Sequence, residues 1–434
     1  MLPKTRGFRV YKAPRGTTDI LPQEQAYWRF MEEKACQICQ LYGYQRIDTP
    51  VFEQTGLFYH SVGEGTDIVE KQMYTFDDHS GMKMTLRPEG TAPVCRAYIE
   101  HGMYNLPQPV RLYYFGPIFR YERPQAGRYR QHQQFGCEAI GDADPALDAE
   151  VIDMAWHLYA SLGLKGLTLQ LNSIGCRNCR PEYLQSLKQY YTGFSQSLCR
   201  DCKARLWQNP LRLLDCKKPS CQEIAKGAPQ ILEHLCHECS SHFDALKQYL
   251  GYLQISYEIN PYLVRGLDYY TRTVFEIQPE GGGAQSTLGG GGRYDNLIEE
   301  LGGRPTPAIG FATGIERIIL NVRKQGIELL PIPGAKVYVA YLGEEAKEEA
   351  IKLVATLRQA GVGATLALGG RSLKAQLKQA NALGVPQAII VGEEEIKRGS
   401  VVLRDMMKGE QVELPLEQVV TRLKRRIDQP RQVK

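Results

Sequence analysis

The sequence predicts an α+β domain that is interrupted by a small helical insert and followed by a separate α/β domain. Residues 111–141 read as two strands joined by a long loop, the hairpin from which antiparallel sheets are built. Eight of the twelve cysteines lie between residues 176 and 239, in a segment with helical periodicity, which indicates an insert. Strand-like and helix-like segments alternate from residue 336 to 391, which predicts a mostly parallel sheet covered by helices.

The bulk composition is that of a soluble globular protein. The chain has 434 residues, enough for two or three domains, with 43% hydrophobic and 23% charged residues. No apolar run approaches the roughly 20 residues that span a bilayer, and residues 1–10 lack the apolar segment of a signal peptide. We therefore expect a cytoplasmic protein without a membrane partner.

The net charge of +5 does not by itself indicate a nucleic-acid partner. Residues 421–434 concentrate six lysines and arginines against a single acid, Asp428. Such a run can contact a phosphate backbone, or it can be the solvated end of a helix. The charge pattern leaves both interpretations open.

The N-terminal part predicts a lead-in loop, a helix and a strand. Residues 10–22 are punctuated by proline and glycine and lack a helical period. From residue 23, apolar residues recur at three- and four-residue steps until Gly43, and a glycine commonly ends a helix. A strand is expected over residues 44–51. Pro50 places its end at a sheet edge or an interface, because proline lacks an amide donor.

Residues 85–91, TLRPEGT, form a short polar turn between an apolar strand and the start of a helix. The carboxylate of Glu89 in such a turn can bind the ammonium group of a substrate. It can equally cap the following helix, as can the hydroxyl of Thr91. A helix over 148–162 and a strand over 167–174 complete this part of the chain.

The hairpin concentrates arginine. Arg120 lies near the end of the first strand, 112–119, and Glu122 shares its face because strand side chains alternate. Three arginines without an acid follow in the loop: Arg123, Arg128 and Arg130. Guanidinium groups fit phosphate oxygens, so Arg120 can bind a nucleotide phosphate while the loop faces a polyanion. The alternative is a surface hairpin in which Arg120 and Glu122 form an ion pair. The return strand, 134–140, carries Glu138.

The insert contains four cysteine pairs, three with C-x2-C spacing and one with C-x4-C spacing: Cys176/Cys179, Cys199/Cys202, Cys216/Cys221 and Cys236/Cys239. Zinc takes four soft ligands in a tetrahedron and each pair supplies two, so the pattern suits one or two structural zinc sites. His234, His237 and His242 lie near the last pair and can replace a cysteine ligand. The alternative is a set of buried thiols without a metal.

The second half of the chain carries three glycine-containing motifs. RGLDYY, residues 265–270, precedes an apolar strand; its glycine lets the backbone approach a ligand, and its tyrosines offer rings and hydroxyls. A structural turn with buried tyrosines is the alternative. Residues 289–295, GGGGRYD, match neither a Walker loop nor a dinucleotide-binding fingerprint. Residues 310–320, GFATGIERIIL, join a glycine-rich strand end to a helix that bears Arg317.

The C-terminal part follows a linker at residues 331–334 and alternates between the two element types. We expect strands over 336–341, 364–368 and 387–391, and helices over 345–360 and 372–383.

In order and spacing these motifs resemble those of the class II aminoacyl-tRNA synthetases. Residues 23–51 match motif 1, the FRYE string with its basic loop matches motif 2, and residues 310–320 match motif 3. The strings ERPQAGRYRQ, RGLDYY and GGGGRYD, with RGTTDILP near the start, resemble the histidyl-tRNA synthetases in particular. The resemblance covers nearly the whole chain.

The resemblance implies a catalytic domain with an antiparallel sheet flanked by helices, divided between residues 1–171 and 257–330. In that family an insertion such as residues 172–256 sits over the acceptor arm of the bound tRNA. Residues 335–434 correspond to the anticodon-binding domain, and motif 1 forms the interface of a homodimer.

The same resemblance implies ATP-dependent ligation of histidine to tRNA(His) through a histidyl-adenylate, with Mg²⁺ bound to the ATP. Arg120 and Arg265 then contact the α-phosphate and Arg317 the γ-phosphate, and Glu122 belongs to the ATP site. The histidine-binding residues implied are Glu89, Gly90, Thr91 and Gln134 around the amino and carboxylate groups, and Glu138, Tyr269, Tyr270 and Tyr294 around the imidazole. The residues that meet the acceptor end of the tRNA are Arg123, Gln125 and Arg128.

Two observations and two alternatives qualify this interpretation. Many relatives have an aromatic residue at the position of His132, and zinc is not a general component of histidyl-tRNA synthetases. A regulatory, non-catalytic relative is one alternative, although such proteins usually lack the C-terminal domain and an intact RGLDYY motif. Another class II synthetase, such as a prolyl or threonyl enzyme, is the second.

Overall fold

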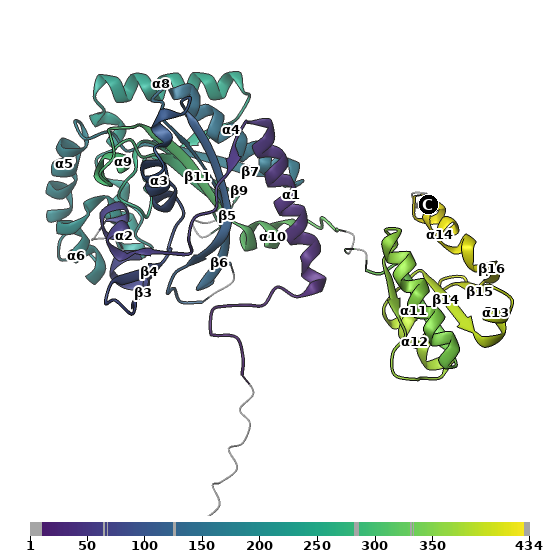
Figure 1. The fold of residues 1–434 in the computed structure, drawn as a ribbon. Coiled ribbons are helices and arrows are strands. Elements are labelled where there is room, and N and C mark those ends of the chain that lie inside the picture. Colours follow the sequence, from purple (N-terminus) through teal and green to yellow (C-terminus); the bar gives the residue numbers. More distant parts are fainter. Residues whose placement is uncertain are drawn as a thin grey trace, which may run out of the picture. The chain divides into compact units, whose positions relative to one another are not determined.

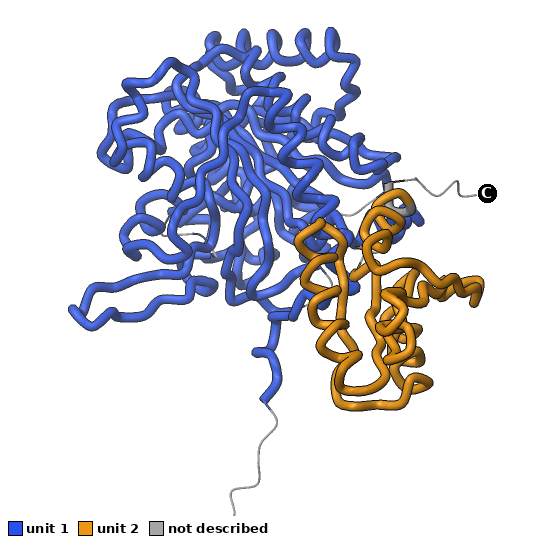
Figure 2. Tube along the Cα trace, turned by 45° about the vertical axis from the view of Figure 1, so that its right-hand side comes forward, with its two compact units in different colours: residues 1–329 blue, residues 330–434 orange. Residues whose placement is uncertain are grey.

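The chain folds into two compact units, residues 1–329 and 330–434 (Figure 2). The structure is a computed structural model, and it describes residues 11–63, 66, 68–124, 127–281, 286–329, 332 and 334–428. No helix within these ranges is both long enough and apolar enough to cross a membrane.

The first unit is built on an eight-stranded sheet with the order β1-β5-β6-β11-β10-β9-β7-β8. The strands in that order are β1 (Gln45–Arg46), β5 (Val110–Phe119), β6 (Gln131–Ile140), β11 (Ala308–Gly314), β10 (Gly289–Arg293), β9 (Thr271–Pro279), β7 (Leu167–Ser173) and β8 (Tyr257–Ile259). The pairs from β5 to β7 are antiparallel, as expected. The two edge strands pair in parallel instead, because each reaches the sheet through a long connection rather than a hairpin.

Helices cover both faces of this sheet (Figure 1). One face packs against α1 (Gln25–Leu41), α4 (Pro145–Ser161), α8 (His237–Tyr252) and α10 (Ile315–Lys324), which share the largest core with the sheet. The other face packs against α3 (Thr91–Glu100) and α9 (Leu297–Glu300). Alternation along β6 sends Phe135, Cys137 and Ala139 into the first core, so Gln134 and Glu138 face the second helical layer.

The strand predicted over residues 44–51 is wrong as a single element. Only the short strand β1, in the large sheet, lies within this range. The next strand, β2 (Phe52–Gln54), begins directly after it and belongs to a separate sheet with β4 (Lys83–Leu86) and β3 (Tyr74–Asp77). Pro50 lies between the two strands, where no ladder donor is required. The side chain of Arg87 holds this link, because its Nη1 donates to the carbonyl of Thr49 at 3.0 Å. The helix α2 (Thr55–Val62) and a short helical turn, Ile68–Gln72, follow β2.

The cysteine-rich segment is helical, as its periodicity predicts. It contains α5 (Arg180–Thr192), α6 (Arg200–Gln208) and α7 (Pro219–Lys226), with short 3-10 turns at Pro210–Leu213 and Ile231–His234. These elements enclose a core of their own. The next helix, α8, packs against α4 and belongs to the main core (Figure 1).

The second unit has a five-stranded sheet with the order β13-β12-β14-β15-β16. The elements are β12 (Val337–Leu342), α11 (Glu344–Gln359), β13 (Ala364–Leu366), α12 (Leu373–Ala382), β14 (Gln387–Gly392), α13 (Glu393–Lys397), β15 (Ser400–Asp405), β16 (Gln411–Pro415) and α14 (Val419–Asp428). The sheet is mixed rather than mostly parallel, because β15 and β16 form an antiparallel hairpin that the sequence did not reveal. Val419 and Leu423 of α14 are buried, whereas Arg422, Lys424 and Arg425 are exposed. This part of the basic run is therefore the solvated face of a packed helix.

Candidate active site

One cavity brings together residues from both halves of the first unit. It lies over β6, β11 and β10, and the start of α3, the RGLDYY turn and the start of α10 surround it. Thirteen of the predicted site residues line it: Glu89, Gly90, Thr91, Arg120, Glu122, Arg128, Gln134, Glu138, Arg265, Tyr269, Tyr270, Tyr294 and Arg317. The predicted residue Arg123 is exposed and lies outside the lining, and Gln125 lies outside the described residues.

A buried carboxyl group forms one end of the cavity. Glu138 accepts hydrogen bonds from Thr91 Oγ1 at 2.7 Å and from the Tyr294 hydroxyl at 2.5 Å. Burial raises the pKa of Glu138 to about 8. Gly310 lies directly opposite on β11, and a Cβ there would collide with Glu138 Oε2. The glycine of the neighbouring strand therefore creates the space that the carboxyl group occupies.

Glu89 combines the two roles that the sequence left open. Its carboxylate caps α3 by accepting the backbone N–H groups of Thr91 at 2.7 Å and Ala92 at 2.8 Å. It also lines the cavity, where burial raises the pKa of Glu89 above its ordinary value. Gly90 beside it lies against the ring of Tyr114, which leaves no room for a side chain.

Three buried tyrosines form an aromatic wall next to this carboxyl pair. The ring centroids of Tyr269 and Tyr270 lie 4.7 Å apart, and those of Tyr269 and Tyr294 lie 5.6 Å apart. A hydrogen bond to the backbone holds this wall in place, because Arg180 Nη2 donates to the carbonyl of Tyr270 at 2.5 Å. The tyrosines of the RGLDYY turn are thus buried, as the structural interpretation expected, and also face the cavity.

Three of the four arginines in the lining occupy the other end, and the fourth, Arg128, pairs with Glu122. Arg120 Nε donates to the carbonyl of Pro88 at 2.7 Å, and Arg265 pairs with Glu276. Arg317 Nε donates to the carbonyl of Gly127 at 3.0 Å. Burial lowers the pKa of Arg317, and the neighbouring arginines lower it further. Like charges gathered in one cavity favour an anionic ligand between them.

Four buried polar atoms in the lining have no hydrogen-bond partner within the described ranges. The Tyr114 hydroxyl and Arg265 Nε can donate, and the other two are the acceptor oxygens Gln134 Oε1 and Glu316 Oε2. The other oxygen of Glu316 accepts the backbone N–H of Gln133 at 2.8 Å, and burial raises the pKa of Glu316 to about 7. Unpaired buried acceptors are costly, so both oxygens point to a ligand that donates hydrogen bonds or carries positive charge.

Sequence reasoning missed several members of the lining, among them Tyr114, His132, Thr287 and Glu316. Glu316 was within reach, because it directly precedes Arg317 in the predicted motif. His132 was noted only as a departure from the family pattern. Burial, with Arg120 and Arg317 nearby, lowers the pKa of His132 to about 3, so its ring is neutral at physiological pH.

The ion pair considered between Arg120 and Glu122 is not formed. Glu122 Oε2 instead lies 3.5 Å from Arg128 Nη1. Arg120 donates from Nε to the carbonyl of Pro88. The alternative of a surface hairpin held by an Arg120–Glu122 ion pair is therefore excluded.

The eight cysteines of the insert form two groups of four, each of which could hold a metal ion. The groups are Cys176, Cys179, Cys236 and Cys239, and Cys199, Cys202, Cys216 and Cys221. Neither group includes a histidine among the described residues, so the possibility that a histidine replaces a cysteine ligand finds no support there. His242 contacts Asp148 at 2.8 Å, and the ring of His234 packs against Tyr183.

Comparison with known proteins identifies the family. The sequence model of histidyl-tRNA synthetase matches residues 16–178 and 210–318, and that of an anticodon-binding domain matches residues 336–426. A histidine–tRNA ligase from Dehalococcoides mccartyi is 59% identical over 418 residues, which cover 96% of this chain and 100% of the relative. The chain belongs to the histidyl-tRNA synthetase family.

Further proteins that are similar to this chain support the assignment. A histidine–tRNA ligase from Desulforamulus reducens is 53% identical, with 95% of this chain and 99% of the relative covered. The crystal structure of apo histidyl-tRNA synthetase from S. aureus matches with a TM-score of 0.80 and 39% identity, covering 96% of this chain and all of that chain. The predicted family and the class II fold with its C-terminal anticodon-binding domain are confirmed. The identities leave no ground for a prolyl or threonyl enzyme.

Proposed function

We propose that this chain ligates histidine to its tRNA in two steps, with histidyl-adenylate as the intermediate. One observation carries the proposal: a single cavity joins a carboxyl–tyrosine network at one end to three arginines at the other. A histidine side chain and a nucleotide phosphate need these two environments side by side, because the reaction joins the amino acid to the α-phosphate of ATP.

The network around Glu138 is suited to an imidazole ring. Imidazole offers one donor and one acceptor nitrogen, and a carboxyl group whose pKa is about 8 can accept from the first or donate to the second near physiological pH. Tyr294 and Thr91 hold this carboxyl group in place by donating to its two oxygens. Tyr269 and Tyr270 provide the apolar wall along the ring.

The other polar groups of this end suit the amino acid backbone. Gln134 Oε1 is an acceptor without a partner among the described residues, which fits an ammonium donor. Glu89 supplies negative charge beside it, and Gly90 and Thr91 bring the N-terminus of α3 toward the cavity.

The arginines position the phosphates and stabilise the charge that develops during transfer. Arg120 and Arg265 bind the α-phosphate, and Arg317 binds the γ-phosphate of ATP with its Mg²⁺. An oxygen of the histidine carboxylate attacks the α-phosphorus and pyrophosphate leaves. A ribose hydroxyl of the tRNA then attacks the histidyl carbonyl and AMP leaves.

The carboxylates at this end suit a magnesium-bound substrate. Mg²⁺ prefers carboxylate and phosphate oxygens. Glu316 has an oxygen without a described partner, and Glu122 lies in the same lining. We assign both to the ATP end of the cavity.

The tRNA and the second subunit are proposed from the family. Arg123, Gln125 and Arg128 meet the acceptor end of the tRNA, and the second unit recognises the anticodon. A homodimer formed through motif 1 is consistent with the exposure of Leu41, Val51 and Phe52. We place the enzyme in the cytoplasm.

Pyrophosphate exchange tests the proposed activity. Radioactive pyrophosphate should enter ATP in the presence of histidine and at least a hundredfold more slowly with each of the other nineteen amino acids. Faster exchange with another amino acid, or none with histidine, would refute the proposed substrate.

A further inference from the structure

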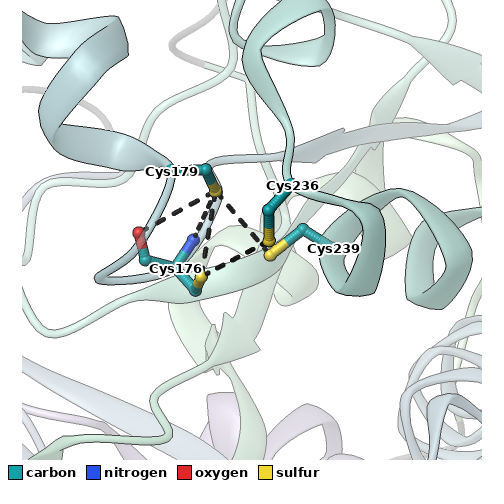
Figure 3. Close-up of side chains that lie close together, drawn as sticks. All are labelled: Cys176, Cys179, Cys236 and Cys239. Atoms are coloured by element: carbon teal, nitrogen blue, oxygen red, sulfur yellow. Dashed lines mark hydrogen bonds between the residues drawn. The ribbon is translucent and has the colours of Figure 1, made fainter.

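The first cysteine group ties together the two ends of the insert. Cys176 and Cys179 follow β7, whereas Cys236 and Cys239 lie at the start of α8, 60 residues further along the chain. Figure 3 shows the four sulfur atoms facing one another across a small gap. We call this group the base cluster.

The spacing of the sulfur atoms in the base cluster matches a tetrahedral metal site. Sγ atoms lie 3.8 Å apart for the pairs Cys176–Cys179, Cys176–Cys236 and Cys179–Cys239. A tetrahedron with metal–sulfur bonds of about 2.3 Å has edges of about 3.8 Å. Disulfide sulfurs would be about 2 Å apart, and all eight cysteines of the two groups are free.

Backbone groups around the base cluster are arranged for thiolates. The N–H of Cys176 donates to Cys179 Sγ at 3.3 Å, and the N–H of Asn178 donates to Cys176 Sγ at 3.4 Å. A thiol is a weak acceptor, so N–H groups aimed at sulfur favour the charged form that metals bind. Gly175, with φ of 67°, makes the turn possible, because a Cβ there would lie 2.8 Å from Cys179 Sγ.

The second group, which we call the inner cluster, repeats this geometry inside the insert. Cys199 Sγ lies 3.9 Å from Cys216 Sγ, and the N–H of Cys199 donates to Cys221 Sγ at 3.3 Å. Cys202, Cys216 and Cys221 belong to the insert's own core. A domain this small commonly needs a metal or disulfides in addition to its apolar core.

Other cysteines of the chain show that burial alone does not produce such groups. Cys36, Cys39, Cys95 and Cys137 are also half-buried or buried, yet none of them joins a set of candidate ligands among the described residues. The converging thiols are therefore a property of the insert.

We infer that the base cluster and the inner cluster are two separate structural zinc sites, each with four cysteine ligands. Sulfur ligands in a compact tetrahedron select zinc over magnesium or calcium. Four ligands close the coordination sphere, so neither site has a position for catalytic water. Each ion stabilises the folded insert, because the unfolded chain cannot hold four thiolates together.

The base cluster also lies directly behind the proposed histidine pocket. Arg180, next to Cys179, donates from Nη2 to the carbonyls of Tyr270 at 2.5 Å and Gly175 at 3.1 Å. The turn that carries the first two ligands therefore supports the aromatic wall.

Metal analysis of the whole protein tests the inference. Protein that is produced with zinc in the medium and purified without chelator should contain two zinc ions per chain, as measured by elemental mass spectrometry. The double substitution Cys236→Ser and Cys239→Ser should leave one zinc, and so should Cys199→Ser with Cys202→Ser. Cys36→Ser is the matched control and should retain two.

A measurement on the unsubstituted protein covers the case that a variant fails to fold. Titration with a thiol-specific mercurial should release two zinc ions, detected with a chromogenic chelator, as eight thiols react. Fewer than two zinc ions per chain, stoichiometric iron instead of zinc, or thiols that react without releasing zinc would overturn the assignment. None of these measurements depends on aminoacylation. The zinc assignment can therefore be refuted while the proposed activity is confirmed, and the activity can be refuted while the zinc assignment is confirmed.

Discussion

At the scale of single residues, the cavity is defined by ionisable groups that the fold has largely removed from water. Glu138 and Glu89 are buried and Arg265 is half-buried, and each has a specific hydrogen-bond or ion-pair partner. Burial without such partners would cost several kcal/mol for each charge. Charged groups kept at this cost indicate function more strongly than the same residue types on the surface.

Arg265→Ala should abolish histidine-dependent pyrophosphate exchange while the fold remains intact. The substitution removes a guanidinium group that is proposed to contact the α-phosphate. Exchange should slow at least a hundredfold, because a preorganised donor contributes about that much to catalysis. Exchange rates and the circular dichroism spectrum measure the two expectations. Arg111→Ala is the control, since Arg111 of β5 forms an ion pair with Glu150 of α4 and lies outside the cavity lining. Near-normal exchange in the Arg265 variant would remove this arginine from the mechanism.

Glu138→Gln should change how the stability of the ligand-free protein depends on pH. The folded protein retains the Glu138 proton up to about pH 8, whereas the unfolded carboxyl releases it near its ordinary pKa of 4.5. The stability contributed by the protonated group is therefore fully present below pH 4.5 and is lost as pH rises toward 8. The variant, which cannot ionise, should lack this loss.

Urea unfolding at several pH values measures this effect. Between pH 5 and pH 8 the free energy of unfolding of the unsubstituted protein should fall relative to that of the Glu138→Gln variant, by a few kcal/mol at most. A difference that stays constant over this range would show that the carboxyl group ionises normally in the folded state.

At the scale of secondary-structure elements, the glycine-rich strands determine the shape of the cavity. β10 and β11 lie at the centre of the sheet, where glycine weakens a strand because it has no side chain to pack. Their glycines allow close approach: Gly290 lies beside Arg265 Nη1, and Gly310 lies beside Glu138. Gly289 and Gly290 of β10 and Gly310 of β11 all line the cavity.

Gly310→Ala should therefore disable histidine binding. Its Cβ would meet Glu138 Oε2 and the backbone carbonyl of Cys137, and in the centre of a sheet neither can retreat far. We expect kcat/KM for histidine in pyrophosphate exchange to fall at least a hundredfold. Gly56→Ala is the matched control, because a Cβ on Gly56 of α2 meets no atom within 4 Å. Equal activity of the two variants would show that the strand adjusts to the methyl group.

At the scale of the whole molecule, the two units have different proposed roles. All residues of the cavity lining belong to the unit that ends at residue 329. The second unit has its own sheet and its own core. In the proposed function, activation of histidine and recognition of the anticodon therefore use different parts of the chain.

A protein truncated after residue 329 should retain histidine-dependent pyrophosphate exchange within about tenfold, because it keeps the cavity and the core beneath it. Its kcat/KM for aminoacylation of tRNA should fall at least a hundredfold, since the anticodon-binding unit is absent. Parallel assays of the two reactions on one preparation measure the split. Equal losses in both reactions would mean that the second unit supports the cavity itself.

Much of the architecture was predictable where the signal is local. The hairpin of β5 and β6, the helices α1, α4, α11 and α12, and the strand-to-helix step at Gly314 follow from periodicity and from glycine and proline positions. The hairpin of β15 and β16 was missed, because it follows a highly charged stretch and only Val401 and Leu403 of its side chains are buried. The strand over 44–51 was wrong for another local reason, since periodicity cannot show that a chain passes from one sheet to another at Pro50.

The sequence alone determined the family, the motifs that meet at the cavity and the presence of four cysteine pairs, because each depends on residues that are close along the chain. Only the tertiary structure decided which cysteine pairs share a cluster, that Glu89 caps a helix and faces the cavity at once, and that Glu122 contacts Arg128. These outcomes join residues through the packing of whole elements, and in the base cluster the partners are 60 residues apart. Spacing along a chain specifies local geometry, whereas the meeting of distant segments depends on how all the cores pack together.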